Sequence, residues 1–187
     1  SSAGPDNVWM RKMFDSIPDK YAFLNKVLTF GRDEAWRREA LSFISPDDGN
    51  RILDICTGTG DLALHIAERF PQHAIYALDY SPRMLDFARD RAKARRRENI
   101  IFRMGDAADM DFEDAYFDYV TISFGFRNLS HSKENLRSAL KETYRVLKPG
   151  GRFIILETSQ PRNIFVRRNL PPLRETDSAC GGSSYLR

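Results

Sequence analysis

The sequence predicts an α/β protein: a three-layer αβα sandwich around a mostly parallel sheet, with a helical extension at the amino end. Two patterns support this prediction. From about residue 8 to residue 43, apolar residues recur at helical spacing, whereas beyond residue 50 short apolar runs alternate with longer amphipathic segments. The second pattern is typical of βαβ units. At 187 residues and 42% hydrophobic content, the chain is long enough to bury the core of one such domain.

The turn-rich segment 45–50 separates the two patterns, so we divide the chain into a helical region, 1–45, and an α/β domain, 46–187. Strands are expected at 51–56, 74–79, 100–104, 117–123 and 152–158. Helices are expected at 61–70, 82–95 and 132–147, with Lys148-Pro149-Gly150-Gly151 stopping the last one. Because helices that connect neighbouring strands make those strands parallel, ligands are expected at the carboxyl ends of the strands.

Composition limits the classes of function that the chain can have. The 29 basic and 26 acidic residues give a net charge of +3, too balanced to indicate nucleic-acid binding, so no nucleic-acid partner is expected. Cys56 and Cys180 lie far apart, and neither a disulfide framework nor a metal site is suggested. No apolar run approaches the roughly 18 residues of a membrane-spanning helix, and no signal-peptide core is present. A soluble, cytoplasmic protein is therefore expected.

A glycine-rich turn lies between the first predicted strand and the helix after it, in the run Leu53-Asp54-Ile55-Cys56-Thr57-Gly58-Thr59-Gly60-Asp61. Glycines at this position let a ligand approach the backbone and the amino end of the helix. However, Gly58, Gly60 and Ala63 also satisfy the dinucleotide pattern G-x-G-x-x-G/A, so an NAD-binding domain is the main competing hypothesis. A tight turn without any ligand is a third.

Three carboxylates help to choose between these hypotheses. Asp79 ends the second strand, where it can accept hydrogen bonds from both hydroxyls of a ribose, in NAD or in another nucleoside cofactor. Asp106, followed by Ala107, comes after the third strand and can face an adenine edge. Asp54 lies inside the first strand, where a carboxylate suits a cationic ligand better than a pyrophosphate. A helix N-cap at Asp79 and a turn at Asp106 are the structural alternatives.

In this order and spacing, these positions resemble the Rossmann-like class I methyltransferases. Two further segments are more specific: Ser123-Phe124-Gly125-Phe126-Arg127-Asn128, and the stretch from Phe14 to Trp36 with Tyr21, Asn25, Phe30-Gly31 and Trp36-Arg37. Together with Leu156-Glu157-Thr158-Ser159-Gln160-Pro161, they resemble the menaquinone and ubiquinone biosynthesis C-methyltransferase family. The resemblance extends from about Met13 to Pro161.

The resemblance implies S-adenosylmethionine as cofactor, S-adenosylhomocysteine as product, and a polyprenylated quinol as methyl acceptor. Demethylmenaquinol is the leading substrate and the benzoquinol of the ubiquinone pathway the second, while a methyltransferase for another small molecule or RNA is the alternative. The cofactor contacts that the resemblance implies are Thr59, Asp61, Asp79, Asp106, Ala107 and Ser123. Asp54, Gly58, Gly60, Tyr80 and Met84 are expected to be further contacts. Arg127, Asn128 and Tyr21 would face the quinol. Because a guanidinium stays protonated, Arg127 would stabilise a phenolate rather than act as a base, and a surface salt bridge is its structural alternative.

The resemblance also bears on the ends of the chain. Residues 1–45 would form a cap or substrate region and 46–187 the catalytic domain. A lipophilic substrate implies a hydrophobic entrance, so peripheral contact with the inner face of the membrane and a homodimer both stay open. Ala22 stands where the family has an aspartate after the tyrosine. After Pro161 the family continues through an antiparallel strand pair, whereas this chain offers only 162–187, so its carboxyl end is expected to be incomplete.

Overall fold

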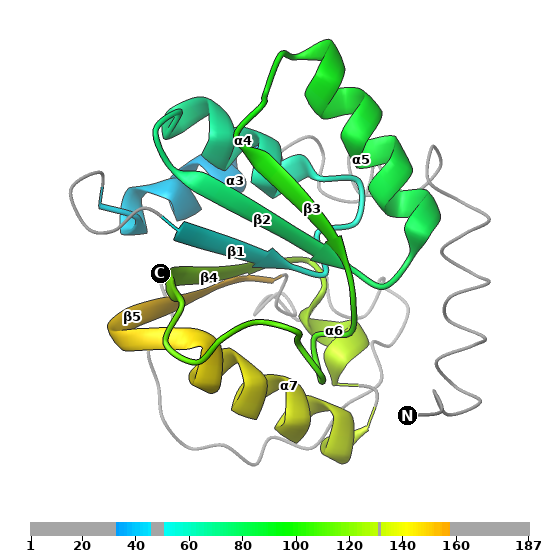
Figure 1. The fold of residues 1–187 in the computed structure, drawn as a ribbon, viewed down its shortest axis with the longest axis vertical. Helices are drawn as coiled ribbons and strands as arrows, with labels where there is room; N and C mark the ends of the chain where they lie inside the picture. The colour runs from blue at the N-terminus through cyan, green and yellow to red at the C-terminus, as the bar shows by residue number, and fades with distance from the viewer. Residues whose placement is uncertain (1–32, 46–50, 131, 158–187) are drawn as a thin grey trace, which may run out of the picture. The chain divides into compact units, whose positions relative to one another are not determined.

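The computed structural model describes residues 33–45, 51–130 and 132–157 (Figure 1). The predicted helices before residue 33, the linker at 46–50 and the carboxyl end lie outside the described residues, and so does Tyr21. The proposed boundary at residue 45 therefore stays a prediction.

Five parallel strands form one sheet in the order β3-β2-β1-β4-β5 (Figure 1). They are β1 (Arg51–Ile55), β2 (Ala74–Asp79), β3 (Ile100–Met104), β4 (Phe117–Ser123) and β5 (Leu147–Leu156). The chain moves outward from β1 to β3 and then returns to the other side of β1 at β4. Strand order reverses at that point, and ligands of such sheets bind where it reverses, outside the carboxyl ends of the strands.

Helices cover both faces of the sheet. One face carries α3 (Asp33–Ala40), the short 3₁₀ helix η1 (Leu41–Phe43), α4 (Asp61–Arg69) and α5 (Pro82–Ala94). The opposite face carries α6 (Phe126–Leu129) and α7 (Lys133–Val146), as Figure 1 shows. The fold is thus the Rossmann-like α/β sandwich that the sequence predicts.

Alternation along β1 explains why the strand reads as an almost continuous apolar run. Ile52 packs with Leu62 and other residues of α4 on one face, whereas Leu53 and Ile55 pack with Phe117 on the other. All five of these side chains are fully or almost fully buried. A strand buried on both faces loses the polar-apolar alternation of a half-exposed strand.

Three details differ from the sequence prediction. First, β5 begins at Leu147, directly after α7, and not at residue 152. Leu147 pairs with Phe117 and Arg152 with Tyr119, so the predicted Pro149-Gly150 turn lies within an irregularity of the strand, with Gly150 at φ +82°. Second, α6 was not predicted, because four residues are too few to show helical periodicity. Third, the carboxyl end of β5 is Leu156, two residues before the predicted end.

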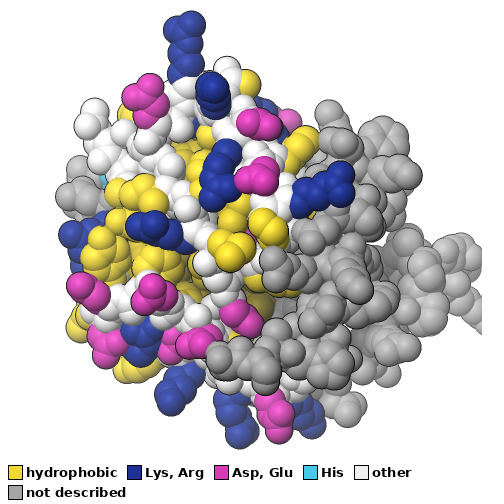
Figure 2. Space-filling model, turned by 45° about the vertical axis from the view of Figure 1, so that its right-hand side comes forward, with side chains coloured by type: hydrophobic (Ala, Val, Ile, Leu, Met, Phe, Trp, Pro, Cys, Tyr) yellow, Lys and Arg dark blue, Asp and Glu magenta, His cyan; other side chains and the backbone are white. Residues whose placement is uncertain are grey.

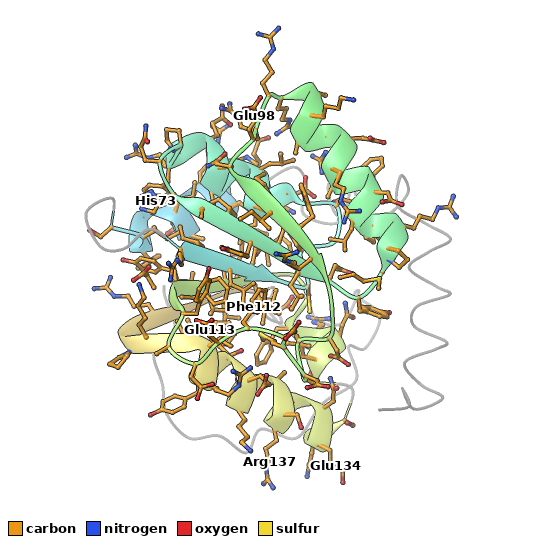
Figure 3. All side chains as sticks on the ribbon, viewed as in Figure 1. His73, Glu98, Phe112, Glu113, Glu134 and Arg137 are labelled. Carbon is orange, nitrogen blue, oxygen red and sulfur yellow. The ribbon has the colours of Figure 1, made fainter. Side chains whose placement is uncertain are left out.

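The loop between β3 and β4 is held against the sheet by an aromatic cluster and by one arginine. Phe112, labelled in Figure 3, packs edge-on against Tyr76 and Phe117. Arg145 of α7 donates hydrogen bonds to the carbonyl oxygens of Met110 at 2.8 Å and of Phe112 at 2.7 Å. These contacts fix the loop that starts with Gly105 and Asp106 at the edge of the predicted site.

Figure 2 shows one face of the molecule, on which Lys and Arg side chains are interspersed with Asp and Glu. Hydrophobic side chains are exposed between them. On this face the charge distribution is unlike the one-sided basic surface that is typical of nucleic-acid-binding proteins.

Candidate functional site

The glycine turn follows β1 and ends at the start of α4. Cys56 turns the chain with a φ of +52°, and Gly58 and Gly60 have φ values of +54° and +75°. The two glycines differ in what surrounds them. A Cβ at Gly60 would lie 3.0 Å from the Cβ of Ala88 on α5, whereas a Cβ at Gly58 would meet nothing within 4 Å. Gly60 therefore allows close packing of α5, and Gly58 borders open space.

Asp79, at the carboxyl end of β2, holds the glycine turn in place. Its Oδ2 accepts a hydrogen bond from the backbone N–H of Gly58 at 2.7 Å, and its Oδ1 accepts one from the N–H of Ser81 at 3.0 Å. Asp79 is not the N-cap of α5. The N-cap is Ser81, whose Oγ accepts a hydrogen bond from the N–H of Met84. Only 7% of Asp79 is exposed, but a carboxylate has about four acceptor sites, so it can still accept from ligand hydroxyls.

Asp54 is a buried carboxylate beneath the turn, with 1% of its surface exposed. It accepts hydrogen bonds from the hydroxyl groups of Thr57 at 2.6 Å and Thr121 at 2.8 Å. Burial raises the pKa of Asp54 to about 6, against the opposing effects of these two hydrogen bonds and of the positive charge of Arg37. A cationic group nearby would favour the ionised form of this carboxyl.

Asp61 is the first residue of α4, and two arginines lie close to its carboxylate. Its Oδ1 lies 2.7 Å from Arg91 and its Oδ2 accepts from the hydroxyl of Thr59 at 2.7 Å, while Arg37 approaches Oδ2 at 4.0 Å. Burial opposes ionisation of Asp61, but the hydrogen bond and charge of Arg91, with smaller contributions from Arg37 and Thr59, outweigh it and lower its pKa. Asp61 is therefore ionised at neutral pH.

A pocket opens above the carboxyl ends of β1, β2 and β4. Nine of the predicted site residues line it: Asp54, Gly58, Thr59, Asp61, Asp79, Tyr80, Met84, Ser123 and Asn128. The Oγ of Ser123 is buried and has no hydrogen-bond partner among the described residues. A buried hydroxyl in this state is rare in native proteins and is expected to pair with a ligand or water.

A second pocket adjoins the first and shares Cys56, Asp79, Tyr80 and Asn128 with it. This second pocket is lined by Asp106 and Ala107, the two residues predicted to meet the adenine. The Oδ1 of Asp106 accepts a hydrogen bond from the N–H of Ala108 at 2.9 Å, which fixes the turn after β3. The two pockets together extend across the ends of β3, β2, β1 and β4.

The predicted quinol-facing residues lie in different surroundings. Asn128 lines both pockets. Arg127, its neighbour on α6, lines neither; 44% of its side chain is exposed, and its Nε lies 3.9 Å from the Oε1 of Glu157 at the end of β5. Tyr21 lies outside the described residues. Of the predicted cofactor contacts, Gly60 does not line either pocket.

Sequence reasoning did not assign a site role to several residues that line the first pocket. Arg37 enters it from α3 with only 5% of its surface exposed. Cys56, Phe124 and Gly125 also line it. The Trp36-Arg37 dipeptide is a sequence signal for Arg37. Cys56 and Phe124 have no such signal, because both have a positive φ, +56° at Phe124, which residues of these types rarely adopt.

Three carboxylates, those of Asp54, Asp61 and Asp79, make the lining of the first pocket acidic. Burial, together with the negative charges of Asp79, Asp54 and Asp106, raises the pKa of the Cys56 thiol well above its usual range, so Cys56 stays protonated. Within residues 33–45, 51–130 and 132–157, no group of three or more His, Cys, Asp or Glu side chains is arranged to hold a metal ion.

No helix in the part of the chain that the structure describes is long and apolar enough to cross a membrane.

Comparison with known proteins identifies the family. Residues 4–170 match the family model described as the ubiE/COQ5 methyltransferase family. The chain belongs to this family. Among curated relatives, the ubiquinone/menaquinone biosynthesis C-methyltransferase UbiE of Geotalea daltonii is 42% identical over 160 residues, which cover 84% of this chain and 66% of the relative. The demethylmenaquinone methyltransferase of Thermus thermophilus is 46% identical over 149 residues, covering 80% of this chain and 66% of that protein.

The chain spans just under two thirds of the length of these relatives. Among solved structures, a putative methyltransferase from Bacillus halodurans is similar to it with a TM-score of 0.58 and 27% sequence identity. That match covers 68% of this chain and 52% of the other. Both the predicted family and the predicted fold class are therefore confirmed.

Proposed function

We propose that the protein transfers the methyl group of S-adenosylmethionine to a ring carbon of a polyprenylated quinol, with demethylmenaquinol as the first substrate to test. The observation that carries the proposal is the pocket that joins the glycine turn, Asp79 and Ser123 to Asn128. Relatives of this family carry the names of enzymes for that reaction.

The residues of the pocket fit this cofactor in three respects. Gly58 borders open space where a Cβ would meet nothing within 4 Å. Ser123 offers a buried hydroxyl that has no partner among the described residues. The carboxylates of Asp54, Asp61 and Asp79 line the pocket, and negative charge there complements the positive charge of a sulfonium and an ammonium group.

Different parts of the cofactor would be held at the ends of different strands. Asp79 would accept from the ribose hydroxyls, and Asp106 with Ala107 would meet the adenine. Thr59, Asp61, Tyr80 and Met84 would border the rest of the ligand. When bound, the cofactor supplies an electrophilic methyl carbon.

The protein would then contribute mainly by positioning. Direct displacement requires the ring carbon, the methyl carbon and the sulfur to be roughly in line, and such orientation is worth up to about 7–11 kcal/mol in well-ordered systems. Asn128 lies in both pockets, where its amide can orient the quinol ring. Arg127 would stabilise the phenolate that makes the ring carbon nucleophilic, with Glu157 at 3.9 Å holding its guanidinium in place.

The proposal extends to the division of the chain and to Tyr21, which lies outside the described residues. Residues 1–45, with Tyr21, would form the substrate region, and 46–187 the catalytic domain. A polyprenyl tail would bring the entrance to a membrane surface. Co-sedimentation with anionic lipid vesicles tests that contact, and sedimentation velocity tests whether the chain forms a homodimer.

Radiolabelled S-adenosylmethionine tests the proposed reaction. Incubation with demethylmenaquinol is expected to move label into the organic phase, and incubation with the demethylated benzoquinol measures the second substrate. Cofactor binding without label in either quinol would contradict the proposal and favour another methyl acceptor.

A further inference from the structure

Arg37 is a buried cation at the edge of the first pocket. It comes from α3, and only 5% of its surface is exposed. Its guanidinium carbon lies 5.2 Å from the centroid of the Phe124 ring, beyond the end of β4, and its Nη2 lies 4.0 Å from the Oδ2 of Asp61, at the start of α4. The side chain therefore lies between the amino end of α4 and the carboxyl end of β4.

The order of the strand ends indicates which part of the cofactor reaches this place. Adenine would lie at Asp106 after β3, and ribose at Asp79 after β2. The next groups along the ligand are the sulfur and then the amino-acid end. Four neighbouring strands span three intervals, about 14 Å. A ligand that extends in this direction passes the glycine turn after β1 and ends beside β4, where Arg37 contacts Phe124.

The charges of the pocket make Arg37 distinctive. Among the described residues that line it, three side chains are carboxylates, those of Asp54, Asp61 and Asp79, and Arg37 is the one cation. The amino-acid end of the cofactor carries an ammonium and a carboxylate. The three carboxylates favour the ammonium and would repel the ligand carboxylate unless a positive charge were close to it.

Asp61 does not use Arg37 as its main partner. Its two oxygens are bound at 2.7 Å by Arg91 and by Thr59, and Arg91 also donates to the carbonyl oxygen of Thr59 at 2.6 Å. Arg91 does not line the first pocket. Arg91 thus compensates the charge of Asp61 from outside the pocket. Arg37 is the more distant cation, with its Nη2 4.0 Å from the Oδ2 of Asp61.

We propose that Arg37 binds the carboxylate of the amino-acid end of S-adenosylmethionine and S-adenosylhomocysteine. The planar fork of a guanidinium matches a carboxylate in geometry and holds its charge at any working pH. This inference rests on the proposed function, because it takes the cofactor of that function as the ligand. It assigns a cofactor-binding role to a helix that precedes the α/β domain.

Calorimetry with two ligands tests the inference without measuring turnover. The first ligand is S-adenosylhomocysteine, and the second is its decarboxylated analogue, which keeps the nucleoside, the sulfur and the amine. The full chain is expected to bind the decarboxylated analogue about 10- to 100-fold more weakly, as for loss of a hydrogen bond to a charged group. Arg37→Ala should weaken S-adenosylhomocysteine by a similar factor and the analogue by less than about threefold.

Arg38→Ala is the matched control. Arg38 lies next to Arg37 on α3, but 69% of its side chain is exposed and it pairs with Glu34 at 2.6 Å. This variant should keep the preference for the carboxylated ligand. Arg37→Lys, which keeps the charge and loses the fork, should retain an intermediate preference.

Two results would overturn the inference. Equal affinity of the unmodified chain for both ligands would do so whether or not any variant folds. Equal weakening of both ligands by Arg37→Ala would show that Arg37 only supports the fold of the pocket. Absence of any S-adenosylhomocysteine binding by the unmodified chain is a different result, because it would overturn the proposed function itself.

Discussion

The Oδ2 atom of Asp79 accepts a hydrogen bond from the backbone N–H of Gly58 at 2.7 Å, so the second strand holds the turn that follows the first. The two residues are 21 positions apart in the chain. The carboxylate proposed to bind the ribose is therefore the same one that supports the glycine turn. Under that proposal, ribose binding and the shape of the turn would be coupled through Asp79.

Replacing Asp79 should lower both cofactor affinity and stability. Asp79→Ala is expected to weaken S-adenosylhomocysteine at least 10-fold, because it removes the ribose acceptor and releases the turn. The free energy of unfolding should fall by about 1–2 kcal/mol, since the N–H groups of Gly58 and Ser81 lose their partner. Calorimetric titration and urea unfolding measure the two effects. Unchanged affinity would remove Asp79 from the ribose position.

The two glycines of the turn should respond differently to alanine. Gly60→Ala is expected to lower stability by about 1–3 kcal/mol, because its φ is +75° and its Cβ would crowd Ala88 at 3.0 Å. Gly58→Ala meets no such contact and should cost only the strain of its φ of +54°, about 1–2 kcal/mol.

Cofactor affinity separates the two variants further. A methyl group at position 58 would enter the space assigned to the ligand, so Gly58→Ala should weaken S-adenosylhomocysteine more than Gly60→Ala does. The reverse order, measured under conditions in which both variants are folded, would move the ligand away from Gly58.

Asp54 should make stability depend on pH between about 4 and 6. Its pKa is about 6 in the folded protein and 3.8 for an unperturbed carboxyl, so the folded state binds a proton more tightly than the unfolded state. Stability from this group is complete below pH 3.8 and is lost as the pH rises through 6. The difference amounts to about 3 kcal/mol at pH 7.

Asp54→Asn removes this titration. Relative to the unmodified chain, the variant is expected to gain stability progressively as the pH rises from 4 to 7, whatever its stability at a single pH. Urea unfolding of both proteins at each pH gives the difference directly. A difference that does not change with pH would mean that the carboxyl of Asp54 titrates normally.

Much of the fold could be predicted because strands buried on both faces leave continuous apolar runs in the sequence, and β1 to β4 have nearly the expected bounds. The start of β5 could not, because Pro149-Gly150 usually marks a turn and here lies inside a strand irregularity. The Trp36-Arg37 dipeptide marks Arg37 in the sequence, but its place in the pocket could not be predicted, because its burial depends on where α3 packs against Asp61 and Phe124. Its helical neighbour Arg38 has the same residue type and is exposed.

Arg145 should stabilise the loop before β4. Arg145→Ala is expected to lower the free energy of unfolding by about 1–3 kcal/mol, because the carbonyl groups of Met110 and Phe112 and the carboxylates of Glu142 and Asp114 lose a shared donor. Arg137, which extends from the exposed side of α7 in Figure 3, provides the control. Arg137→Ala should change stability by less than about 0.5 kcal/mol. Equal effects of both variants in urea unfolding would contradict the role of Arg145.

The role of Arg127 separates binding from chemistry. Its side chain is 44% exposed and lies beside the pocket rather than in its lining, with Glu157 at 3.9 Å. Arg127→Ala is therefore expected to leave the affinity for S-adenosylhomocysteine within about twofold. Loss of the cation that stabilises a phenolate should lower the rate of methyl transfer about 100- to 1,000-fold.

The most direct measurement is transfer of labelled methyl from S-adenosylmethionine to demethylmenaquinol by the unmodified chain and by Arg127→Ala, with S-adenosylhomocysteine affinity measured on the same samples. We predict label in the quinol for the unmodified chain, and near loss of transfer with unchanged affinity for the variant. Full cofactor affinity without any transfer by the unmodified chain, or transfer that is unaffected by Arg127→Ala, would contradict the account of this site.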